Sequence, residues 1–151
     1  MAGWTNKGKY HVLNVVFRNA TEKTNYYIAL CTDATAPTAA TNTLGQLTEI
    51  ADGQGYTTGG FQLTPNATDF DVLTEDDTNS KALIQVKNVT WTATGGSIPA
   101  SGDPIRYAVL IDDNATVGSR EVYAWWDLYP TRTAATSEVI TLSDLELDLT
   151  E

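Results

Sequence analysis

The chain has 151 residues, a formal net charge of −10 and one cysteine. A chain of this length can form one domain, residues 1–151, with a sizeable hydrophobic core, and a lone cysteine excludes an intrachain disulfide. No apolar stretch approaches the roughly 18 residues of a membrane span, and so acidic a chain repels the phosphates of nucleic acids. We therefore expect neither a membrane nor a nucleic acid as partner.

The charge is unevenly distributed along the chain. The first 24 residues carry Lys7, Lys9, Arg18 and Lys23 against Glu22, a net charge of +3, which leaves −13 for the remainder. A basic segment on an acidic body is consistent with polar docking against another protein, and equally with a solvated face. Both interpretations stay open at this stage.

The first predicted element is an amphipathic helix over residues 6–18. Tyr10, Leu13, Val16 and Phe17 recur at helical spacing after a possible cap at Thr5 or Asn6. We expect this apolar stripe to cover the sheet that follows it.

The apolar period changes to two after this helix. Residues 26–32, YYIALCT, are apolar on both faces, as expected of a central strand that is buried on both sides. The Thr43-x-x-Gln46 arrangement can cap a helix reciprocally, so a short helix is expected near residues 43–51.

The glycines of ADGQGYTTGG do not form a phosphate-binding loop. A dinucleotide fingerprint needs glycines after a strand and before a helix, but here the expected helix comes first and a strand, residues 60–64, comes after. We interpret Gly53, Gly55 and Gly59 as positions of positive φ at a helix exit and a strand entrance.

The rest of the chain reads as strands separated by turns. An edge strand near residues 70–73 leads into an acidic turn at 75–80, and the inward phase of the next strand shifts near Asn88, which predicts a β-bulge. Later strands are expected at 105–111, at 121–128 with Val122, Ala124, Trp126 and Leu128 inward, at 139–142, and at 145–149. The predicted fold is mainly β, an antiparallel, jelly-roll-like β-sandwich with an N-terminal amphipathic helix and one short helix.

No constellation of residues predicts catalysis or a cofactor. The only histidine, His11, and the only cysteine, Cys31, lack a flanking motif that would activate them. The Asp-rich turns do not follow the spacing of a calcium-binding loop. We expect no enzyme, no metal and no cofactor. Trp125 points outward on its strand, where burial under the helix or a neighbouring subunit, or contact with a sugar, would occupy it.

Several segments taken together resemble a family of small structural proteins of tailed bacteriophage virions. The segments are GWTNKGKY with the helix after it, YYIALCTDATAPTAATNTLGQLTEI, ADGQGYTTGG and DFDVLTEDDTN. The resemblance implies a non-enzymatic virion protein, synthesised in the host cytoplasm and located on the capsid surface or the tail. It implies as partners the major capsid protein and sister copies, in a homo-oligomer that is a trimer by analogy.

The leading hypothesis is a head decoration (cement) protein that binds the outside of the assembled capsid and stabilises it. A tail-associated or fibre-like module that binds a host surface glycan is the alternative, and hydrolysis of a cell-wall or capsule polymer is a third hypothesis. The candidate partner contacts are Trp4, Lys7, Lys9, Arg18 and Trp125.

Overall fold

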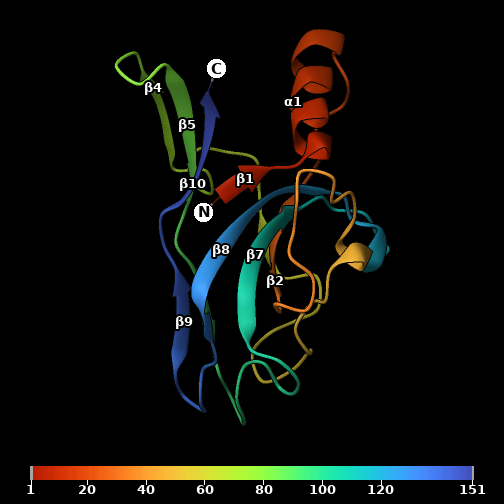
Figure 1. The fold of residues 1–151 in the computed structure, drawn as a ribbon, viewed down its shortest axis with the longest axis vertical. Helices are drawn as coiled ribbons and strands as arrows, with labels where there is room; N and C mark the ends of the chain where they lie inside the picture. The colour runs from red at the N-terminus through yellow and green to blue at the C-terminus, as the bar shows by residue number, and fades with distance from the viewer. Residues whose placement is uncertain (1, 151) are drawn as a thin grey trace.

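The computed structural model describes residues 2–150 and is built mainly of antiparallel strands, with an α-helix close to its N-terminal end (Figure 1). In chain order the elements are β1 (Ala2–Trp4), α1 (Asn6–Arg18), β2 (Tyr26–Cys31), η1 (Leu44–Gln46), β3 (Phe61–Leu63), β4 (Val72–Asp76), β5 (Lys81–Val86), β6 (Val89–Thr92), β7 (Ile105–Ile111), η2 (Val117–Ser119), β8 (Val122–Arg132), β9 (Val139–Leu142) and β10 (Leu145–Thr150).

The largest sheet has five strands in the order β1-β8-β7-β2-β3, and each neighbouring pair is antiparallel. Strand β2 lies inside this sheet, as its sequence predicts. Ile28 and Leu30 point into the main core, while Ala29 and Cys31 point into a second cluster on the opposite face. Because both faces are covered, this strand is apolar throughout.

The second layer consists of the pair β6-β9 and the inner ends of β5 and β10, two strands of the sheet β10-β5-β4. Its inward side chains, among them Val89, Trp91, Ile140 and Leu145, pack on the inner face of the five-stranded sheet. The predicted antiparallel β-sandwich is confirmed by this two-layer core.

The opposite face of the five-stranded sheet is covered by irregular chain around η1 and η2. The short helix expected near residues 43–51 is one turn of 3-10 helix with the predicted Thr43/Gln46 capping box. After it the chain becomes extended, because Glu49 bridges to Cys31 and the Ile50 amide donates to the Leu30 carbonyl at 3.0 Å. Pairing with the end of β2 thus replaces a second helical turn.

One inward residue of β8 was assigned to the wrong face by strict alternation. Val122 lies in the second cluster, whereas Ala124 and Trp126 lie in the main core. The reason is a β-bulge: Ala124 is opposite Leu110, but Val122 is opposite Ile111, so two steps on β8 match one step on β7.

The phase change predicted near Asn88 is present, but it is a break between two sheets rather than a bulge. Val86 is opposite Leu145 before the break and Val89 is opposite Leu142 after it, so the pairing register is unchanged. On one side of the break, β6 and β9 belong to the sandwich. On the other side, β5 and β10 extend away from it and, with β4, form a three-stranded sheet that projects from one end (Figure 1).

Helix α1 has the predicted bounds but not the predicted packing. It projects from the same end as the three-stranded sheet, and the two stand apart in Figure 1. Its predicted core stripe is exposed, with 78% of Phe17 and 55% of Leu13 accessible to solvent. The expectation that this stripe covers the following sheet is therefore wrong: within α1 only Gly8, in the first turn, is buried.

The glycine-rich segment is a turn, as predicted. Gly53 and Gly55 have φ angles of 108° and 105°, and a Cβ on Gly55 would lie 2.1 Å from the Thr92 carbonyl oxygen. Glycine is required here by backbone conformation and by close approach.

Candidate functional site

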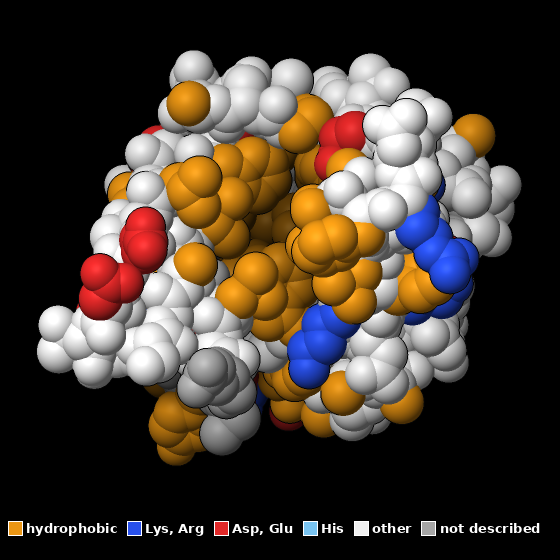
Figure 2. All heavy atoms as spheres, turned by 90° about the horizontal axis from the view of Figure 1, so that it is seen from above, with side chains coloured by type: hydrophobic (Ala, Val, Ile, Leu, Met, Phe, Trp, Pro, Cys, Tyr) orange, Lys and Arg blue, Asp and Glu red, His pale blue; other side chains and the backbone are white. Residues whose placement is uncertain are grey.

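The most distinctive feature of the surface is an apolar groove between α1 and the three-stranded sheet. It has a volume of about 370 Å³, and Figure 2 shows it as a hollow lined by hydrophobic side chains. Its lining residues are Trp4, Gly8, His11, Val12, Tyr26, Pro65, Asn66, Ala67, Phe70, Leu73, Ile84, Leu110, Tyr123 and Leu147.

The sheet wall of the groove is a row of aliphatic side chains. Leu73 on β4 is opposite Ile84 on β5, which is opposite Leu147 on β10. Cross-strand partners project from the same face of a sheet, so all three point into the groove. Exposure rises along the row, from 3% for Leu147 to 77% for Leu73, and the outer part of this wall is therefore unprotected from water.

The helix wall is positioned by two residues at the start of α1. Thr5 is fully buried, and its hydroxyl accepts from the Gly8 amide at 2.9 Å and donates to the Val122 carbonyl. This is an N-cap that also joins the helix to β8. A Cβ on Gly8 would lie 2.1 Å from the Tyr123 carbonyl oxygen, so glycine permits the contact.

The floor of the groove holds a polar cluster on the body side of α1. His11 stacks on Tyr123 with ring centroids 4.7 Å apart, and its Nε2 lies 2.9 Å from the Tyr26 hydroxyl and 3.1 Å from Glu22. Tyr26 also donates to Glu22. Burial raises the pKa of Glu22, but hydrogen bonds from Tyr26, His11 and the Lys23 amide outweigh it and lower the pKa. The ionised carboxylate thus helps to hold the helix to the body.

The helix carries a second apolar face that points away from the groove. Gly8, His11 and Val12 line the groove, whereas Tyr10 and Leu13 are more than half exposed. On a helical projection with 100° per residue the two sets lie on opposite sides. A helix that is apolar on two sides is typical of one enclosed by other elements, yet within residues 2–150 nothing covers the outer side.

Opposite charges flank the groove. Helix α1 contains Lys7, Lys9 and Arg18 and no acidic residue, whereas the outer end of β4 carries Glu75 and the turn after it carries Asp77. Figure 2 shows acidic side chains on the β4-β5 side of the hollow, and on the α1 side basic side chains together with an acidic group at the rim. The groove is therefore electrically polar across its width.

Four of the five predicted contact residues lie at this end of the molecule. Trp4 lines the groove and donates its indole N–H to the Asp148 carbonyl at 2.9 Å. Lys9 and Arg18 are exposed on α1, and Lys7 is paired with Glu121 at 2.7 Å.

Trp125 lies elsewhere. It is half-buried in the second cluster, and Gly3 of β1 lies against its ring. Pairing of β1 with β8 places Gly3 opposite Trp125, so within the chain a strand rather than the predicted helix packs on this side chain.

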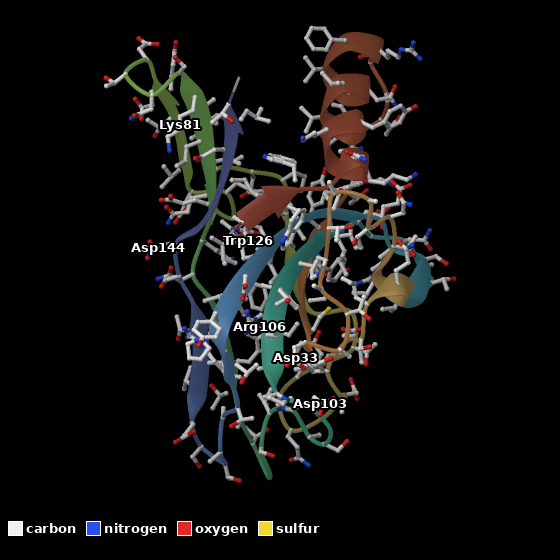
Figure 3. The ribbon with its side chains drawn as sticks, in the orientation of Figure 1. Asp33, Lys81, Asp103, Arg106, Trp126 and Asp144 are labelled. Carbon is white, nitrogen blue, oxygen red and sulfur yellow. The ribbon has the colours of Figure 1, made fainter. Side chains whose placement is uncertain are left out.

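The sheet wall of the groove was not predicted from the sequence. Leu73 and Phe70 are apolar residues within an acidic segment, and this combination is the signal that marks them. Lys81, labelled near the outer end of the same sheet in Figure 3, forms an ion pair of 3.0 Å with Asp148. This pair joins β5 to β10 near the end that projects into solvent.

The residues that were considered for catalysis are not assembled into a site. Cys31 is fully buried in the second cluster, while His11 lines the groove on the other side of the five-stranded sheet. Of the predicted turn acids, Asp112 is paired with Lys23 at 2.9 Å and Asp69 with Lys87. Across residues 2–150 no group of three or more His, Cys, Asp or Glu side chains is arranged to hold a metal ion.

Comparisons with known proteins do not assign a family to this chain. No protein-family model matches the chain, and no curated protein is significantly similar to it. No helix in the part of the chain that the structure describes is long and apolar enough to cross a bilayer.

Proposed function

We propose that the protein is a non-enzymatic structural protein of a tailed-phage virion, a head decoration protein that binds the outside of the assembled capsid and stabilises it. The observation that carries this proposal is the projecting apolar end formed by α1 and the β10-β5-β4 sheet. Large hydrophobic side chains gathered on one end of an acidic chain are typical of a surface that other proteins cover.

The sequence resemblance to small phage structural proteins supports the same proposal. Its segments contribute both walls: GWTNKGKY leads into α1, and DFDVLTEDDTN contains Phe70 and Leu73. Part of the resemblance thus falls on residues that line the groove, whereas ADGQGYTTGG lies outside it.

The mechanism is thermodynamic. A protein that binds only the assembled shell stabilises that shell by mass action, by RT ln(1 + [L]/Kd) for each site. The rest of the chain, with its negative charge, keeps a densely decorated particle soluble. No chemistry at a catalytic residue is required.

The glycan-binding alternative uses Trp125, together with aromatic residues of the loops, as stacking platforms. Gly3 lies against the Trp125 ring, which is half-buried, so this position offers less ring surface to a sugar than the sequence suggests. We therefore keep the decoration protein as the proposal.

Intact virions and stripped capsids test this function. Antibody labelling should place the protein on the head surface, and adding the purified protein to capsids stripped of it should restore their resistance to heat. An unrelated acidic protein of similar size serves as the control. Label on the tail alone, or stripped capsids with unchanged heat resistance, would refute the proposal.

A further inference from the structure

We propose that the groove receives helix α1 of a second copy of the chain, so that two copies interlock their projecting ends around a twofold axis. The inference rests on the proposed function and names a sister copy as the protein that covers the groove, which leaves the outer surface of the pair to contact the shell. It stands on three observations: the second apolar face of α1, the row of aliphatic side chains on the sheet, and the charges that flank them.

The twofold arrangement gives each apolar surface a partner. With the second copy inverted, its α1 enters between α1 and the sheet of the first copy, and the first helix enters the partner's groove in the same way. The layers are then sheet, partner helix, helix, partner sheet. The two helices meet through the side that carries Val12, and the outer side with Leu13 meets the partner's Leu73. Both faces of α1 become buried.

The spacing of the helix matches the spacing of the sheet wall. From Lys9 to Leu13 the helix rises by about 6 Å, and from Glu75 to Leu73 the strand spans about 6.6 Å. In the inverted orientation the first turn of α1, which contains Lys9, lies at the outer end of the partner's sheet. Lys9 then meets the partner's Glu75 in the register that places Leu13 on the partner's Leu73.

Charge favours a sister copy over other occupants. An α1 with three basic and no acidic residues enters between an acidic hairpin and another such helix, and its basic base is placed beside the acidic turn. The facing sides of the two helices meet through Val12, an uncharged residue that lines the groove, while Gly8 and His11 stay packed on Tyr123 of their own chain. A partner of another sequence would have to carry both a basic helix start and an uncharged facing side.

Sedimentation velocity of the free protein tests the inference. We expect a concentration-dependent dimer, and Leu73→Glu should weaken its dissociation constant by about tenfold or more, because the carboxylate would be buried against apolar side chains. Val139→Glu is the matched control, since Val139 is 55% exposed on β9, outside the groove, and it should leave the dimer unchanged.

A charge exchange gives a second, independent readout. Lys9→Glu and Glu75→Lys should each weaken the dimer, and the double variant should recover much of the loss because the pair is restored with reversed signs. Both side chains are exposed, so each variant retains the fold.

A protein that stays monomeric, forms trimers, or dimerises with no sensitivity to Leu73→Glu would overturn the inference. So would binding of the monomer to phosphatidylglycerol vesicles through α1 in place of dimerisation. The proposed function fails separately: a dimer that does not bind capsids refutes the decoration role alone, and a monomer that protects them refutes the interlocked pair alone.

Discussion

Removing the Thr5 hydroxyl should destabilise the protein far more than removing the Thr5 methyl group. The hydroxyl caps α1 through the Gly8 amide and donates to the Val122 carbonyl, in a position with no solvent access. Loss of an N-cap costs about 0.5–2 kcal/mol, and a buried carbonyl left without its donor costs about 1–3 kcal/mol. Thr5→Ala also removes the buried methyl group, worth about 1 kcal/mol, and should therefore lower the free energy of unfolding by about 2.5–6 kcal/mol, a large part of the ~5–15 kcal/mol available to a typical domain.

Thr5→Ser separates the two contributions. Serine keeps both hydrogen bonds and loses one buried methyl group, which is worth about 1 kcal/mol. Urea unfolding of the three proteins, with m values compared to verify a common unfolding reaction, measures the difference. If Thr5→Ala and Thr5→Ser agree within about 0.5 kcal/mol, the hydroxyl does not hold the helix to β8 and the description of this attachment is wrong.

Four further predictions concern the core and the helix attachment. Gly8→Ala should lower the free energy of unfolding, measured with urea, by about 1–3 kcal/mol, because the clash of the new methyl group with the Tyr123 carbonyl outweighs the ~1 kcal/mol gain in helix propensity. A variant more stable than the wild type would show that Gly8 does not lie against this carbonyl. Tyr56→Phe should cost about 1–3 kcal/mol by the same assay, since its buried hydroxyl donates to Glu49 at 2.6 Å and accepts from a backbone amide, and a neutral result would remove that role. Burial raises the pKa of the Cys31 thiol, so Ellman's reagent should react only with the unfolded protein; rapid labelling of the native state would show that the second cluster opens. The pKa of Glu22 is lowered in the folded protein, so its stabilising effect is present above its unfolded pKa of about 4.3 and is lost as the pH falls through the folded value. Glu22→Gln should therefore flatten the acid side of the plot of unfolding free energy against pH. An unchanged acid side would show that this carboxylate does not stabilise the fold.

Local sequence signals predicted the elements of the fold better than their surroundings. The cap at Thr5 and the spacing of Tyr10 to Phe17 give helix bounds that match α1, and the two-sided apolar run of β2 predicts its central place. Periodicity shows that a face is apolar but not what covers it. For this reason the prediction that the apolar stripe of α1 faces the core is wrong.

The groove could not be predicted because it depends on contacts between distant segments. The approach of Gly8 to Tyr123 and the bulge that turns Val122 to the other face leave no local mark on the sequence. The break after Val86 does leave a mark, the phase change near Asn88, but that mark does not show that the break separates a projecting sheet from the sandwich. These features follow from contacts between separate segments of the chain rather than from local sequence, so the predicted contact residues identified the helix side and missed the Leu73 side.

Intermolecular disulfide formation tests the interlocked pair most directly. Leu13 lies on the side of α1 that faces away from its own sheet, and the native Cys31 is fully buried, so a bond between cysteines at positions 13 and 73 requires two chains. A mixture of Leu13→Cys and Leu73→Cys proteins under mild oxidation should give a disulfide-linked dimer in high yield, and neither protein alone should do so. A mixture that yields no more dimer than its separate components would contradict the placement of one copy's helix in the groove of the other.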